Sequence, residues 1–118
     1  MKAIVKGIDT NSHISFDAYC PEDVECFGLW ITVMVGPDSE DGGHLYQVLV
    51  CTPAWIKQEC LRVGVIWGRH MLIISSYDQN KIRNEIERYV QGCTGKDFLD
   101  IAQKVARIGA WEFEDYQG

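Results

Sequence analysis

The chain has 118 residues, of which 47% are hydrophobic and 24% are charged, and its formal net charge is −6 at pH 7. These values are typical of a globular protein with a hydrophobic core, and they exclude an intrinsically disordered chain. No run reaches the roughly 20 apolar residues of a membrane-spanning helix, and residues 1–9 lack the continuous apolar region of a signal peptide. We therefore expect one domain, residues 1–118, in the cytoplasm.

Acidic residues are segregated along the chain. Residues 7–56 contain no lysine or arginine, whereas residues 57–118 balance their bases and acids. The acids of the base-free span are Asp9, Asp17, Glu22, Asp23, Glu25, Asp38, Glu40 and Asp41. A phosphate backbone binds a basic surface, so this pattern disfavours direct binding of nucleic acid. It indicates instead a contiguous negative face that binds a protein partner with a basic face.

The first half of the chain shows the alternation that is typical of β-strands. We expect a short strand at residues 2–8, an acidic loop at 17–26, and strands at 27–35 and 45–51. The two glycines of residues 38–43 suit a hairpin connection, so the last two strands should pair antiparallel. Both faces of this hairpin carry large apolar side chains. One face should therefore pack on helices, and the other should be covered or bind something.

The second half of the chain predicts helices. Thr52 and Pro53 read as an N-cap followed by proline at the first helical position, which starts a short helix to about residue 60. Asp78 caps a second helix that Gly92 ends, and Ile82, Ile86, Tyr89 and Val90 form its apolar stripe. A third helix should cover about residues 96–107.

Two further stretches alternate and complete the expected fold. Residues 63–75 predict a long strand with Gly68 in its middle, and the residues from Trp111 to Tyr116 predict a tail strand or a docked arm. The fold class is therefore α+β, with a mostly antiparallel sheet of four or five strands. Two main C-terminal helices and one short helix should pack on one face of that sheet.

The five cysteines are an odd number at irregular spacing, and they predict buried free thiols in a reducing cytosol. A zinc site from Cys20, Cys26, His13 and His44 is conceivable, but the spacing matches no standard ligand pattern. The sequence also lacks a glycine-rich phosphate-binding motif and a His-Glu-x-x-His motif. We therefore expect no metal and no cofactor.

Cys51 and His70 are the candidates for nucleophilic catalysis, because adjacent strands could bring a thiol beside an imidazole. No glycine-rich turn exposes Cys51 as a nucleophile. A core thiol and a hydrogen-bonded histidine are the better interpretation, so we expect no catalytic residue and no enzyme activity.

The four tryptophans divide into two pairs. Trp55, in the short helix, and Trp67, beside Gly68, are expected in the core or half-buried. Trp30 lies on the strand face opposite its apolar neighbours, and Trp111 lies in the acidic tail. Aromatic side chains beside acids make good anchors for a protein partner, so Trp30 and Trp111 are candidate interface residues.

Several short strings, spread over nearly the whole chain, carry a family resemblance. They are Met1-Lys2-Ala3, Pro21-Glu22-Asp23, Phe27-Gly28-Leu29-Trp30, Gly36-Pro37, Val50-Cys51-Thr52-Pro53-x-Trp55, Gly68-Arg69-His70 and Ile108-Gly109-x-Trp111-Glu112-Phe113-Glu114-Asp115-Tyr116. In these strings the chain resembles the immunity protein 8 family of bacterial polymorphic toxin and contact-dependent growth inhibition systems. The resemblance implies a cytosolic protein without catalysis of its own that binds one cognate toxin domain and blocks it. Toxins of such systems are often nucleases.

We therefore interpret the chain as an antitoxin that docks an acidic surface on the basic active-site face of a toxin, with a nuclease expected. The expected partner-binding residues are acids and aromatic anchors: Asp17, Glu22, Asp23, Glu25, Trp30, Asp38, Glu40, Asp41, Trp111, Glu112, Glu114, Asp115 and Tyr116. We expect a monomer in a 1:1 complex, with neither nucleic acid nor membrane as partner. Two alternatives stay open: an acidic nucleic-acid mimic that inhibits a host DNA-binding protein, and a small cysteine hydrolase that uses Cys51 and His70.

Overall fold

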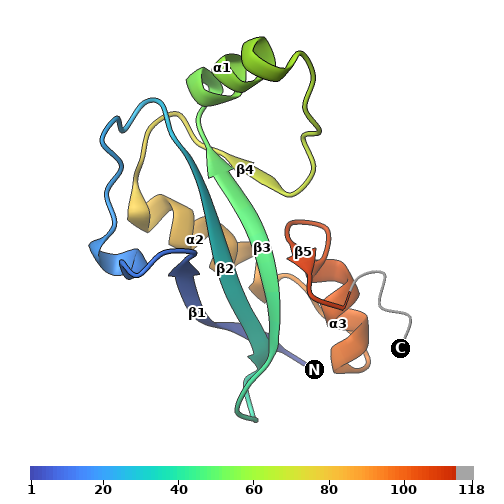
Figure 1. Cartoon of the computed structure of the whole chain (residues 1–118). Helices are drawn as coiled ribbons and strands as arrows, with labels where there is room; N and C mark the ends of the chain where they lie inside the picture. The colour runs from blue at the N-terminus through green and yellow to red at the C-terminus, as the bar shows by residue number, and fades with distance from the viewer. Residues whose placement is uncertain (114–118) are drawn as a thin grey trace.

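A computed structural model describes residues 1–113 of the chain, and Figure 1 traces its course. The strands are β1 (Ala3–Thr10), β2 (Gly28–Pro37), β3 (His44–Cys51), β4 (Met71–Ile73) and β5 (Ala110–Trp111). The helices are α1 (Pro53–Val63), α2 (Gln79–Gln91) and α3 (Phe98–Val105), with a 3₁₀ turn, η1, at Phe16–Ala18. The fold class is α+β, as expected from the sequence.

The sheet has the strand order β1-β2-β3-β4, in which β1, β2 and β3 are antiparallel neighbours and β4 runs parallel to β3. β5 also pairs with β3, antiparallel at Tyr46 and Gln47. Because β2 occupies one edge of β3, the other edge is shared between β5 and β4. The β2–β3 hairpin is the longest ladder, and it runs from Gly28 opposite Cys51 to Val35 opposite His44.

The hairpin turn depends on two glycines that approach other backbone atoms closely. A Cβ atom on Gly36 would lie 2.0 Å from the carbonyl oxygen of Gly42, and a Cβ atom on Gly43 would lie 2.3 Å from the carbonyl oxygen of Val35. Both distances are far below van der Waals contact, so the two backbone segments can approach this closely only if both positions are glycine. The glycines therefore determine where the hairpin turns.

One face of the sheet is covered by α2 and α3. The inward side chains of β2 and β3 form one cluster with apolar residues of both helices: Ile31, Val33, Val35, Tyr46, Val48, Val50, Ile82, Ile86, Val90, Ile101 and Val105. The predicted stripe of α2 is confirmed, because Ile82, Ile86 and Val90 are its buried residues. Asp78 caps α2 by accepting a hydrogen bond from Lys81 N at 3.1 Å.

The expected strand at residues 63–75 is wrong. α1 continues to Val63 and ends at Gly64, whose φ is +90°, and only Met71–Ile73 forms a strand. The alternation of Val63, Val65 and Trp67 resembles a strand, but a strand needs a partner edge. β4 and β5 already occupy the free edge of β3, so residues 65–69 have no edge to join.

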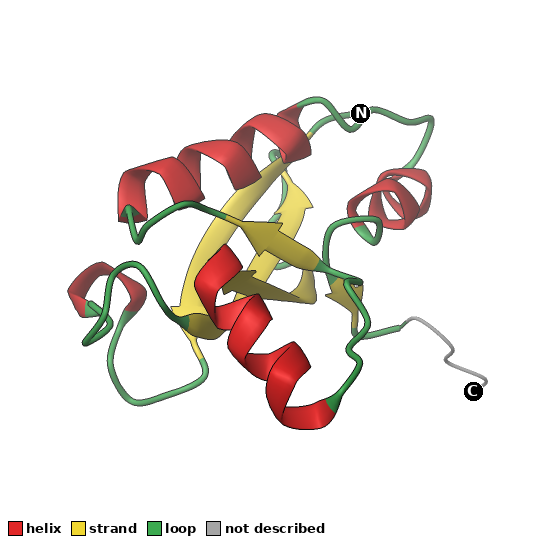
Figure 2. Cartoon of the chain, turned by 90° about the horizontal axis from the view of Figure 1, so that it is seen from above, coloured by secondary structure: helices red, strands yellow, loops and turns green. Residues whose placement is uncertain are grey.

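Helix α1 differs from the other two helices because none of its residues is buried. It begins directly after the end of β3 and lies beyond the end of the strands, away from α2 and α3 (Figure 1). Figure 2, viewed from that end, shows α1 in front of the sheet. Residues 53–70, which include α1 and the following loop, are called the α1 lobe below.

Candidate functional site: the two ends of the hairpin

Seven of the eight acids of the base-free span lie in two groups at opposite ends of the β2–β3 hairpin (Figure 1). The eighth, Asp9, lies in β1 opposite Thr32. The first group, called the acid loop, is residues 17–26, which precede β2. The second, called the acid turn, is residues 38–41, which follow β2. Ten residues of β2 separate them, or about 30 Å at roughly 3.3 Å per residue. The expectation of one contiguous negative face is therefore corrected to two separate faces.

In the acid loop, three carboxylates are exposed and make no ion pair within residues 1–113: Glu22, Asp23 and Glu25. Asp17 differs, because its Oδ1 lies 2.8 Å from Nη2 of Arg83 on α2. The loop is held in place by backbone contacts with the segment before α2. Tyr77 N donates to the carbonyl oxygen of Val24 at 2.7 Å. The loop thus presents three unneutralised acids on a fixed backbone.

Lysine side chains accompany the acid turn. Lys6 Nζ donates a hydrogen bond to the backbone oxygen of Glu40, and Lys2 lines a small cavity together with Asp38. The turn therefore carries nearby positive charge, although the carboxylates of Asp38, Glu40 and Asp41 make no ion pair among residues 1–113. The base that pairs with the acid loop is Arg83, which binds Asp17 and leaves the other three acids of that loop unpaired within this part of the chain.

The turn end also contains Trp111 and Glu112, and both are used internally. Trp111 Nε1 donates a hydrogen bond to His44 Nδ1 at 3.1 Å, and the two rings stack with centroids 5.5 Å apart. His44 also meets Phe98 and Phe113, each with ring centroids at 5.1 Å. Glu112 Oε1 accepts a hydrogen bond from Leu45 N at 3.0 Å. Of the tail strand or docked arm predicted from Trp111 to Tyr116, only Trp111 lies in a strand, β5, and Glu112 and Phe113 form a turn. The ring of Trp111 packs against the edge of the sheet at Tyr46. Glu114, Asp115 and Tyr116, also expected to bind the partner, lie outside the described residues.

The face of the sheet that α2 and α3 leave open is polar in its middle. Thr32 Oγ1 donates to Asn11 Oδ1 at 2.8 Å, Gln47 Nε2 to Thr32 Oγ1 at 3.0 Å, and Asn11 Nδ2 to Gln47 Oε1 at 3.0 Å. This closed ring of hydrogen bonds satisfies its own polar atoms. It separates the apolar side chains near α1 from those near the turn.

At the α1 end, apolar side chains face solvent. The exposed fractions are 46% for Trp30, 78% for Leu61, 80% for Val65, 91% for Trp67 and 56% for Ile73. These five residues are called the apolar patch below. Trp30 had been expected at the surface, but the expectation that Trp67 lies in the core or is half-buried is wrong.

Trp67 is exposed because the residues around it form a loop and not the strand predicted at residues 63–75. Gly64 ends α1, so Trp67 falls in a loop without a neighbouring strand. Trp55 is half-buried as expected, and it packs where a Cβ atom on Gly28 would lie 2.3 Å from its ring. The glycine after the helical stretch was the one sequence signal that could have revealed the exposed loop.

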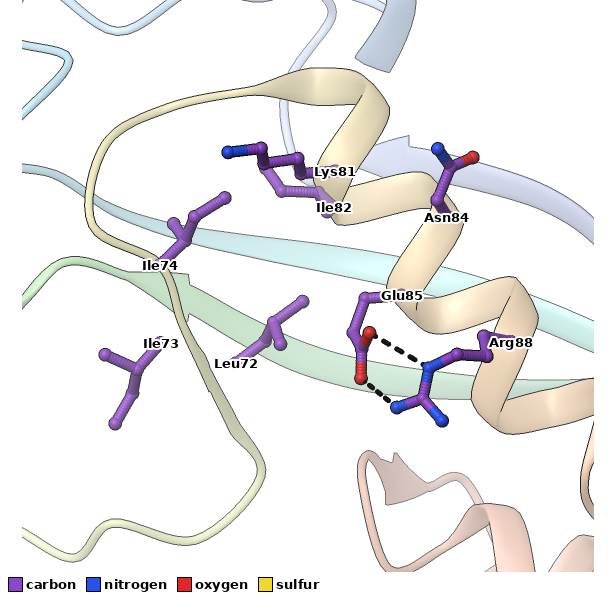
Figure 3. A pocket seen from close by; sticks show the side chains of 8 residues that line it. All are labelled: Leu72, Ile73, Ile74, Lys81, Ile82, Asn84, Glu85 and Arg88. Carbon is purple, nitrogen blue, oxygen red and sulfur yellow. Dashed lines mark hydrogen bonds and ion pairs between the residues drawn. The ribbon is translucent and has the colours of Figure 1, made fainter.

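A groove lies between β4 and α2 beside the α1 lobe (Figure 3). It has a volume of about 510 Å³, with Leu72, Ile74 and Ile82 at its apolar floor. Polar side chains of α2 form its rim, where Arg88 Nε donates to Glu85 Oε2 at 3.2 Å. The hydrogen bond from Arg88 lowers the pKa of the Glu85 carboxyl. With Lys81, which also lines the groove, the charged side chains of the rim sum to +1.

The candidate catalytic pair is not assembled. Cys51 lies opposite Ile73 in the β3–β4 ladder, three residues or about 10 Å along the strand from His70. Cys51 is fully buried, and burial raises the pKa of its thiol, which disfavours the reactive thiolate. His70 Nε2 lies 3.0 Å from the carbonyl oxygen of Ala106. Both residues have the structural roles that the sequence favoured.

A metal-binding cluster and a membrane-spanning helix are both absent from residues 1–113. In this part of the chain, no three side chains of histidine, cysteine, aspartate or glutamate come together in a way that could hold a metal ion. The conceivable zinc set is thus not formed among these residues. The same residues include no helix with the length and apolar character to cross a bilayer. All five cysteines are free.

Fold and surface together define a class of protein. A small α+β protein that exposes several large apolar side chains and unpaired acids at one end has the features of a protein-binding module. Comparison with known families gives the particular one: the model of the Immunity protein 8 family matches residues 3–116, and the chain belongs to this family. It is therefore an immunity protein of a polymorphic toxin system, whose partner is a cognate toxin. No curated protein and no solved structure matches the chain.

Proposed function

We propose that this immunity protein neutralises a toxin nuclease by docking its acid loop on the basic face around the toxin's active site. A nuclease must attract the phosphates of its substrate, so its active-site face is positive. An acidic surface can occupy that face without imitating the substrate's chemistry. The protein acts in the cytoplasm, without catalysis of its own, as a monomer in a 1:1 complex.

The observation that carries the proposal is the set of three exposed acids in the acid loop that no described base neutralises. Charges of this kind act at a distance of about 8 Å at physiological salt. They therefore steer the approach of a cationic protein and raise its association rate, by up to about 10²–10³ over an uncharged pair. The remaining affinity comes from apolar contacts made after encounter.

The test uses the cognate toxin domain, to be sought as the C-terminal domain of a large secreted protein encoded immediately upstream of this chain's gene. Its association rate with the immunity protein is measured by stopped flow between about 20 and 500 mM salt. We expect the rate to fall by about tenfold or more over this range, and the toxin's nuclease activity to stop at one equivalent. A rate that is indifferent to salt contradicts the electrostatic docking. Binding to several unrelated basic proteins would favour the nucleic-acid mimic instead.

A further inference from the structure

The apolar patch and the acid loop lie at the same end of the molecule. Thr52, the N-cap of α1, bonds the residue that precedes β2: Thr52 N donates to the carbonyl oxygen of Phe27 at 3.1 Å, and Phe27 N donates to Thr52 Oγ1 at 3.2 Å. The chain that leaves the acid loop is thus fastened to the start of the α1 lobe. Any partner that covers this end meets both features.

The α1 lobe has little packing of its own. An isolated helix of fewer than about 12 residues is marginal in water, and α1 has 11 residues, none of them buried. Exposed apolar surface costs about 25 cal/mol per Å², so the patch gains from being covered. Large exposed apolar patches on soluble proteins mark interaction sites.

We infer that the α1 lobe is the apolar anchor of the toxin interface, with Trp67 and Leu61 inserting into an apolar pocket that adjoins the toxin's basic face. The inference rests on the proposed function and adds the surface that holds the toxin after encounter. Charge complementarity selects this occupant, because the acids Glu22, Asp23 and Glu25 border the same end and fit a cationic partner. Tryptophan is the residue most enriched among interface hot spots.

The same charges disfavour a second copy of the chain as the occupant. A two-fold dimer through the α1 end would bring the same patch of both subunits together. The acid loops of both copies would then face each other, and juxtaposed like charges cost several kcal/mol. A cationic toxin instead meets the acid loop as an opposite charge, and this attraction comes from the loop and not from the α1 lobe, which contains Lys57, Arg62 and Arg69 beside Glu59.

The experiment compares three variants in the purified protein. Leu61→Glu and Trp67→Ala each alter the α1 lobe, one on the helix and one in the loop. Leu99→Glu is the matched control: Leu99 is also an exposed helical leucine, at 55%, and it follows Phe98, which contacts His44 at the turn end. Thermal unfolding of each variant is recorded, and the equilibrium affinity for the same toxin domain is measured by calorimetry.

We expect Leu61→Glu and Trp67→Ala each to weaken toxin binding about 30-fold or more, the range of an interface hot spot, and Leu99→Glu to change it less than about twofold. Toxin affinity equal to wild type in both lobe variants would overturn the inference. The inference would also be overturned if the wild-type protein forms a dimer in free solution and Trp67→Ala converts it to monomers without loss of toxin affinity. If wild type itself does not bind the toxin domain, the proposed function fails, and this outcome is distinct from the other two.

Discussion

The two ends of the β2–β3 hairpin contain similar residues but use them differently. Each end has a group of acids and at least one tryptophan. At the turn end, Trp111 stacks on His44 and donates a hydrogen bond to it, and lysines accompany the acids. At the α1 end, Trp67 is exposed, and three acids have no ion pair among the described residues. At the turn end Trp111 and Glu112 are used within the fold, whereas at the α1 end Trp67 is left exposed to solvent.

The difference comes from where later segments of the chain return. β5 comes back to the half of β3 next to the turn and supplies aromatic rings that cover it. Among residues 1–113, the half next to α1 pairs only with the three residues of β4. The packing of Trp111 and the exposure of Trp67 therefore follow from the path of the C-terminal half, and the residue type, which is the same at both positions, does not explain the difference.

The largest expected effect on stability is that of replacing Trp111, and the same replacement of Trp67 should have almost none. Trp111→Ala removes a half-buried ring, its stacking and its hydrogen bond, and we expect a loss of about 2–3 kcal/mol in the free energy of unfolding. Trp67→Ala removes only exposed surface and should change it by less than about 0.5 kcal/mol. Urea denaturation measures both. Equal losses would mean that Trp67 is packed, and the contrast between the two ends would disappear.

Charge reversal distinguishes the two acid groups. Lysine at Glu22, Asp23 and Glu25 together should slow association with the toxin about 10- to 30-fold, because it inverts the field that steers the partner. The matched triple reversal of Asp38, Glu40 and Asp41 should slow it less than about threefold, since lysines already lie near that turn. The measurement is the association rate at low salt. A larger effect from the acid turn would move the docking face to the other end.

Removing the N-cap of α1 should have a smaller effect on the free energy of unfolding. Thr52 Oγ1 accepts hydrogen bonds from Phe27 N and from Trp55 N at 3.4 Å, so Thr52→Ala should destabilise the protein by about 1–2 kcal/mol. Thr52→Ser keeps the hydroxyl and should retain most of the stability. Chemical denaturation compares the three proteins. If serine is as damaging as alanine, the methyl group rather than the cap stabilises this junction.

The smallest effect at neutral pH comes from Tyr46 in the core. Burial, with smaller contributions from Cys93 and Glu112, raises the pKa of Tyr46 above its ordinary value near 10. Above pH 10 the unfolded chain releases this proton while the folded protein keeps it, so the free energy of unfolding falls as pH rises. Urea midpoints at pH 8 to 11 measure the slope, and Tyr46→Phe should flatten it. An unchanged slope in that variant would assign the alkaline loss to other groups.

Local patterns were sufficient for the parts of the fold that depend on neighbours in sequence. The alternation in β2 and β3 and the glycines between them predicted the hairpin, and the spacing of Ile82, Ile86 and Val90 predicted α2. The same kind of pattern failed at residues 63–75, because alternation has no structural meaning without a free strand edge. The acids were found by sequence, but their division into two groups was not, and Trp67 was expected inside.

The sequence by itself determined the family, the long hairpin, the capped helices and the excess of acid in the first half of the chain. These are properties of composition and of contacts between near neighbours. The tertiary structure alone decided which acids stand together and which tryptophan meets solvent. The physical reason is that β2 keeps the two acid groups about 30 Å apart, while β5 brings Trp111 against β3 and the loop after α1 leaves Trp67 in solvent.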